Sequence, residues 1–66
     1  MDIDAKKQIA SKHYEKMAKR YKDEKNIIMP DEIVRQMMEG VIKAENSREI
    51  QHYINDAFAL YSIQNL

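Results

Sequence analysis

A chain of 66 residues without cysteine, 44% hydrophobic and 33% charged at a formal net charge of zero, holds one small domain that no disulfide can brace. The composition is too apolar for a disordered chain, and no apolar run reaches the roughly 18 residues that a membrane span needs. The first residues also lack the apolar core of a signal peptide, so we expect one cytoplasmic domain over residues 1–66.

The residue types favour helices. One Gly and one Pro leave little material for β-turns, whereas the good helix formers Lys, Glu, Ala, Met, Gln and Arg dominate. Residues 1–25 hold eight Lys or Arg against five Asp or Glu, and residues 26–66 hold three against six. The sequence therefore predicts an all-α domain of three helices with a long basic first helix, short connectors and no strands, whose oppositely charged parts attract each other within the fold or across a dimer.

The first helix is expected from about Asp4 to Lys25, capped by Asp2 or Asp4. At 3.6 residues per turn its apolar side chains fall within an arc of about 60°. These side chains are Ile3, Ala10, Tyr14, Met17 and Tyr21. Because this seam is narrow, the first helix covers only part of the apolar surface that the other two helices present.

Pro30 disfavours helix at Met29 and suits the first turn of a second helix, expected over Pro30 to Glu45. In the connector before it, Ile27 and Ile28 are expected to plug the core. Gly40 is interpreted as a helical residue at a close backbone contact. The alternative ends this helix at Gly40 and begins one long helix, Val41 to Ile63.

The third helix is expected to begin with Asn46 or Ser47 as its cap, and Asn46 with Glu49 has the spacing of a capping box. Its apolar residues cover an arc of about 140°, which is an ordinary core face. They are Ile50, Tyr53, Ile54, Ala57, Phe58 and Tyr61. We expect residues 62–66 to fray, with Leu66 free to fold back or not.

The second helix carries apolar residues in adjacent pairs that cover about half of its circumference. The pairs are Ile33-Val34, Met37-Met38 and Val41-Ile42. Either this helix is the middle of the domain, or part of the stripe meets another molecule. If Ile33, Met37 and Val41 face the core, the other strip remains for a partner. The predicted partner-binding residues are Val34, Met37, Met38 and Ile42.

Catalytic chemistry is not expected. There is no Cys nucleophile, the Ser residues have no evident base, and one Gly cannot build a phosphate-binding loop. His13 and His52 lack the companion residues of a metal site. We therefore expect no enzyme activity, cofactor, metal or small-molecule substrate.

The leading hypothesis is a non-enzymatic protein-interaction module, such as a small regulator, inhibitor or accessory factor, that presents a Met/Ile/Val surface to a protein partner or to itself as a homodimer. The alternative is a small nucleic-acid-binding regulator that uses the basic face of the first helix. Its phosphate contacts would come from Lys12, Lys16, Lys19, Arg20 and Lys22. Membrane binding is not expected, because the apolar face of this helix lacks Trp, Phe and Leu.

Overall fold

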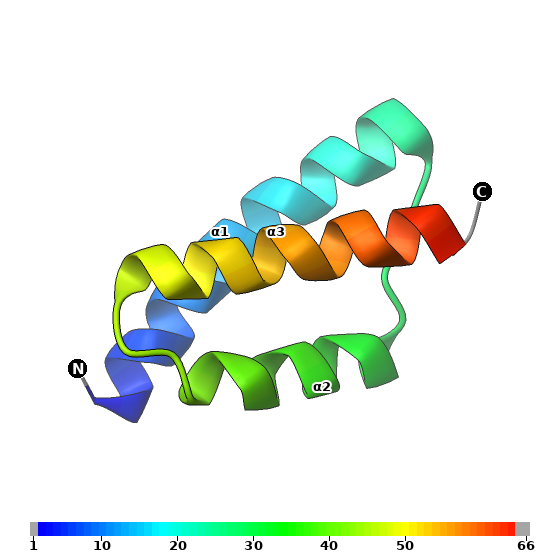
Figure 1. The fold of residues 1–66 in the computed structure, drawn as a ribbon. Helices are drawn as coiled ribbons and strands as arrows, with labels where there is room; N and C mark the ends of the chain where they lie inside the picture. Colours follow the sequence, from blue (N-terminus) through cyan, green and yellow to red (C-terminus); the bar gives the residue numbers. More distant parts are fainter. Residues whose placement is uncertain (1, 65–66) are drawn as a thin grey trace.

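The computed structural model describes residues 2–64, which fold into three α-helices joined by two short connectors (Figure 1). α1 spans Ile3–Lys25, α2 spans Asp31–Ile42 and α3 spans Ser47–Gln64. Consecutive helices run in opposite directions, and each helix contacts the other two. No strand occurs within the described residues, so the predicted all-α class with three helices is confirmed.

Hydrogen bonds at both ends of α1 explain its limits. The Asp2 carboxylate accepts a hydrogen bond of 2.7 Å from the backbone N–H of Ala5, which confirms one of the two predicted caps. At the other end Asn26 adopts the left-handed conformation with φ 54°, and its N–H donates to the Lys22 carbonyl at 3.0 Å. Asn is one of the few residues besides Gly that tolerate this conformation, so α1 stops before the connector.

α2 begins after Pro30 as expected but ends three residues earlier than predicted. At its end the N–H of Lys43 donates to the Gly40 carbonyl, and the N–H of Ala44 donates to the Val41 carbonyl. These i to i−3 bonds tighten the last turn and stop the helix. Gly40 lies inside α2, as predicted, and the alternative of one long helix that starts at Val41 is wrong.

The start of α3 confirms the predicted cap. The side-chain oxygen of Asn46 accepts from the N–H of Glu49 at 2.9 Å, and the Glu49 carboxylate accepts from the N–H of Glu45 at 2.7 Å. The helix continues to Gln64 and buries Ser62, so the predicted fraying is wrong for residues 62–64. The expectation for Leu66 lies outside the described residues.

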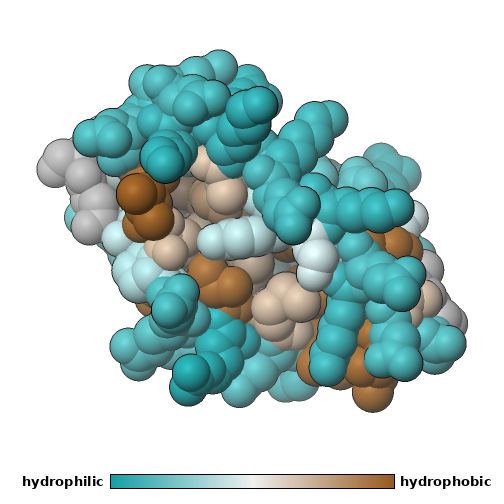
Figure 2. Space-filling view, turned by 180° about the vertical axis from the view of Figure 1, so that it is seen from behind, coloured by the Kyte–Doolittle hydropathy of each residue, from teal (hydrophilic) through white to brown (hydrophobic). Residues whose placement is uncertain are grey.

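The outer face of α1 is hydrophilic, as its charged residues predict. Figure 2 shows the molecule from behind, the side on which α1 lies in front of α3. Hydrophilic side chains cover most of this face and border an interrupted band of apolar residues. The apolar side of α1 therefore meets α2 and α3, and its charged side faces solvent.

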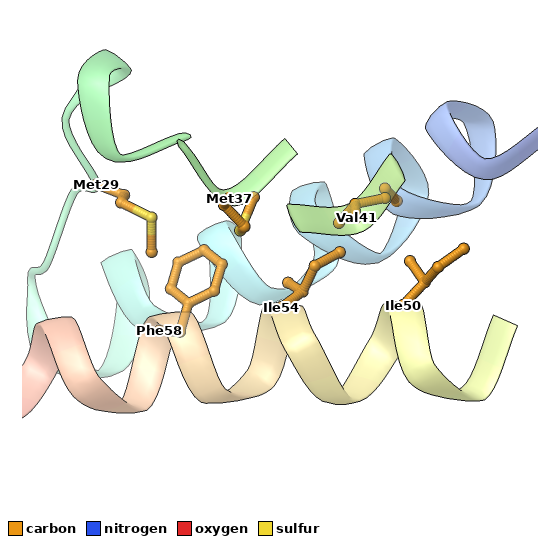
Figure 3. Packing of buried hydrophobic residues seen from close by; sticks show 7 residues of the cluster. Met29, Met37, Val41, Ile50, Ile54 and Phe58 are labelled. Atoms are coloured by element: carbon orange, nitrogen blue, oxygen red, sulfur yellow. The ribbon is translucent and has the colours of Figure 1, made fainter. Parts of the chain in front are cut away.

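The core lies where the three helices meet. Phe58 is 1% exposed, and its ring lies 5.6 Å from the Tyr14 ring and 5.0 Å from the Tyr21 ring. In Figure 3 the side chains of Met29 and Met37 point toward Phe58 from the connector and from α2. The buried hydrophobic residues of the described chain are Ala10, Met29, Met37, Val41, Ile50, Ile54 and Phe58.

Three predicted core positions are corrected. Ile28 is 67% exposed, and Met29 plugs the end of the core in its place. Ile3, expected on the buried seam of α1, is half exposed because it begins the helix, beyond most of the packed surface. Tyr53 is 43% exposed because it lies at the edge between α2 and α3. The rest of the seam and of the α3 face is buried or packs against the core.

Candidate protein-binding groove

The apolar pairs of α2 divide between the core and its two edges. Met37 and Val41 are buried, so of the two strips the one that contains Ile33, Met37 and Val41 is the one that faces the core. Val34 and Met38 are half-buried and pack against the core cluster, and Ile42 is half-buried at the end of the helix. Met37 is therefore withdrawn from solvent, whereas the other three predicted partner-binding residues are each partly open to it. The binding role of these residues stays a prediction.

A groove runs along the junction of α2 and α3, the two helices that lie side by side in Figure 1. It encloses about 450 Å³, within the usual size range of binding clefts. Among residues 2–64, its lining residues come from these two helices alone. They are Ile33, Gln36, Met37, Tyr53, Asp56, Ala57, Leu60, Tyr61 and Gln64. We call this feature the α2–α3 groove.

Two large apolar side chains on the α3 wall of the groove are open to solvent. Leu60 is 61% exposed and Tyr53 is 43% exposed, although both are large hydrophobic side chains. On the other wall Ile33 is partly buried, and Met37 forms part of the floor. The groove thus combines exposed apolar side chains with the polar side chains of Gln36, Asp56 and Gln64, and a concave surface of this mixed kind can serve as a binding site.

Gly40 shapes one end of this region. A Cβ atom added to Gly40 would overlap the ring of Tyr53, so only glycine lets this ring lie against α2. The sequence correctly predicts a close contact at Gly40, but the neighbour is a side chain and not the backbone of another helix. The Tyr53 ring also lines the α2–α3 groove, and the absence of a side chain on α2 therefore helps to form the groove wall.

The charge at the groove is negative. Asp56 is the only charged residue among the described residues that line it. Glu32 and Glu39 are exposed and stand four and three residues from Gln36, on the same edge of α2. Lys43, also exposed, follows that edge just beyond the end of the helix. Three of the six acidic residues of positions 26–66 thus lie in or beside the groove.

The exposed residues of α3 were not among the predicted site residues. Their signal is the stretch from Ala57 to Tyr61, in which five successive residues are apolar or aromatic. Five successive residues of a helix point in all directions, so they cannot all face one core. Among the large hydrophobic side chains of this stretch, Leu60 is the most exposed to solvent.

The basic residues proposed for nucleic-acid contact lie on α1, away from the groove. All five are exposed, and the Arg20 guanidinium lies 3.5 Å from the carboxylate of Glu24. Lys12, Lys16 and Lys19 fall within an arc of about 60° on the solvent face of the helix. They form a modest basic surface that acidic residues of the same helix interrupt.

The remaining polar groups contribute to packing. The ring Nε2 of His13 and the side-chain oxygen of Asn55 are 2.8 Å apart and join α1 to α3. Burial, and to a smaller extent the carboxylate of Asp31, raises the pKa of Tyr14. Within residues 2–64 no three His, Cys, Asp or Glu side chains gather as a metal site would require. In the same part of the chain, no helix combines the length and apolarity needed to span a membrane.

Comparisons with protein-family models, with curated proteins and with solved structures find no match to this chain.

Proposed function

We propose that this protein is a non-enzymatic interaction module that binds another protein through the α2–α3 groove. The observation that carries the proposal is the exposure of Leu60 and Tyr53 in a concave surface whose floor is the core residue Met37. Full burial of a Leu side chain contributes about 1.5–3 kcal/mol. Since Leu60 is 61% exposed, covering it would contribute about 1–2 kcal/mol to binding.

The size of the domain supports the same interpretation. A chain of 66 residues buries only about 60% of the surface that its unfolded chain would expose, and small domains without disulfides or metals gain stability from association. The exposed apolar side chains of the groove are surface that a partner can cover. A partner bound in the groove would both add buried surface to this small domain and cover the exposed apolar side chains.

The test compares two variants of the same helix. Leu60→Glu places a charge in the α2–α3 groove, whereas Ile63→Glu places one at a side chain that is 65% exposed and does not line it. The tagged wild-type chain and both variants are used for affinity capture from the native cell and for sedimentation at matched concentrations. We expect a specific protein, or self-association, that Leu60→Glu abolishes and Ile63→Glu preserves.

Circular dichroism shows whether both variants remain helical. If the wild type and a folded Leu60→Glu variant capture the same proteins and sediment alike, the groove is not the binding surface. The proposal would then be wrong in its site.

A second candidate function is nucleic-acid binding by α1. The observation in its favour is that Lys12, Lys16 and Lys19 share one exposed face of the helix. Phosphate contacts weaken steeply as salt rises, whereas apolar docking does not. Titration of labelled single-stranded and duplex nucleic acid at low and physiological salt therefore separates the two functions.

A further inference from the structure

The charges around the α2–α3 groove point to the chemistry of its occupant. Asp56 belongs to the lining itself, and Glu32 and Glu39 border the opposite wall beside Gln36. Lys43 is the one basic residue on this edge within the described chain, and it lies beyond the last turn of α2. The border of the groove is therefore acidic along most of its length.

The other two basic residues of this half do not neutralise that border. Arg35 lies about 100° around α2 from Gln36, away from the groove. Arg48 lies on the first turn of α3 at about 120° from Leu60, on the side that faces away from the groove. Both side chains are exposed. A ligand in the groove therefore meets apolar side chains along its centre and carboxylates at its sides.

The dimensions suit a helix. The α3 residues that line the groove run from Tyr53 to Gln64, which corresponds to about 16 Å, or about three turns. Helices that bind in grooves use apolar anchors at positions i, i+3 or i+4, and i+7, which cover a similar length. Leu60, Ala57 and Tyr53 have the same spacing on α3 and would lie opposite such anchors.

We infer that the occupant of the α2–α3 groove is an amphipathic α-helix of a partner protein, with apolar anchors on one face and Lys or Arg residues beside them. The inference rests on the proposed function and adds the class of partner. The apolar anchors would cover Leu60 and Tyr53, and the flanking cations would meet Asp56, Glu32 and Glu39. Charge complementarity of this kind mainly sets the choice of partner and the rate of association.

A second copy of the chain fits this surface less well. A two-fold dimer through the groove places the acidic borders of two copies against each other, and like charges in an interface oppose association. The chain's own basic helix, α1, does not supply the missing anchors. Its apolar seam is already used in the core, where Ala10 is fully buried.

The experiment uses two synthetic peptides with identical Leu anchors at i, i+3, i+4 and i+7. One peptide carries Lys at the flanking positions and the other carries Glu. Their binding to the full chain is measured by fluorescence anisotropy at physiological salt. We expect the Lys peptide to bind at least about tenfold more tightly than the Glu peptide.

Variants of the chain test the role of each wall. Leu60→Glu should weaken binding of the Lys peptide by at least about tenfold, while Ile63→Glu should leave it unchanged. Glu32→Lys combined with Asp56→Lys reverses the border charge and should reverse the preference between the two peptides. These positions are exposed, so the variants are expected to fold, and circular dichroism checks this.

The outcomes separate the inference from the proposed function. If the Glu peptide binds as tightly as the Lys peptide, and both depend on Leu60, the basic partner is wrong while the groove remains a docking surface. If neither peptide depends on Leu60, and Leu60→Glu also leaves capture and sedimentation unchanged, the proposed function fails. If the wild type is a dimer that Leu60→Glu dissociates and the Lys peptide does not, a second copy occupies the groove and the inference is overturned.

Discussion

Phe58 offers the sharpest test of the fold, because one side chain joins all three helices and the connector. It is 1% exposed, lies between the rings of Tyr14 and Tyr21, and receives Met29 and Met37 from the other side (Figure 3). Phe58→Ala removes the ring and leaves a cavity that neighbouring residues on three helices fill only in part. Such truncations cost about 3–5 kcal/mol.

That cost is large for this chain. Small domains have unfolding free energies of about 0.05–0.15 kcal/mol per residue, which corresponds to about 3–10 kcal/mol for 66 residues. Phe58→Ala should therefore unfold a substantial part of the population in water. Phe58→Leu retains apolar volume but loses both ring contacts, and we expect it to cost about 1–3 kcal/mol.

Urea unfolding followed by far-ultraviolet circular dichroism measures these changes. Leu60→Ala is the matched control, because Leu60 lies two residues away on the same helix but is 61% exposed. Its truncation should change the free energy of unfolding by no more than about 0.5 kcal/mol. If Phe58→Ala and Leu60→Ala had the same small effect, the packing shown for α3 would be refuted.

Three further changes test other parts of the structure. Because burial raises the pKa of Tyr14, the native chain keeps this proton at a pH where the unfolded chain has lost it. The contribution of the neutral Tyr14 to stability is thus complete below about pH 10 and is lost as pH rises through the raised pKa. In Tyr14→Phe, the free energy of unfolding measured in urea should therefore fall less steeply at high pH than in the wild type. Gly40→Ala should give little or no stabilisation in the wild type, because the new methyl group displaces the ring of Tyr53, but should gain up to about 1 kcal/mol in a Tyr53→Ala background; equal effects in both backgrounds would contradict this contact. Lys16→Glu with Lys19→Glu should leave the urea midpoint within about 0.5 kcal/mol of wild type and leave protein association intact, since exposed charges contribute little to stability; a large loss of association would show that α1 is an interface.

The helix ends were predictable where a local interaction decides them. Asp2 caps the residues directly after it, Pro30 restricts its own neighbour, and Asn46 with Glu49 form a cap within four residues. The end of α2 was not predictable in this way. The apolar pattern continues to Ala44, but the backbone bonds to Gly40 and Val41 already form a tighter turn.

The sequence predicted the kind of site, an apolar helical surface, but not the residues that form it. Helical periodicity assigns each residue an angle on its own helix, but it does not say which neighbour lies at that angle. The sequence left open which strip of α2 faces the core; Met37 and Val41 are buried there, and the groove is lined by Ile33 and not by Met38. The rotation of α2 that decides this depends on contacts with another helix. The Tyr53 ring over Gly40 is one of them.

This contact also relates the packing of the helices to the proposed binding surface. The Tyr53 ring lines the groove because Gly40 leaves room for it, so a side chain at position 40 would change the groove by displacing this ring. Tyr53 is 43% exposed, and its displacement costs little core packing. Binding should therefore respond to Gly40→Ala more strongly than stability does. If Gly40 served only helix packing, Gly40→Ala would instead change stability more than binding.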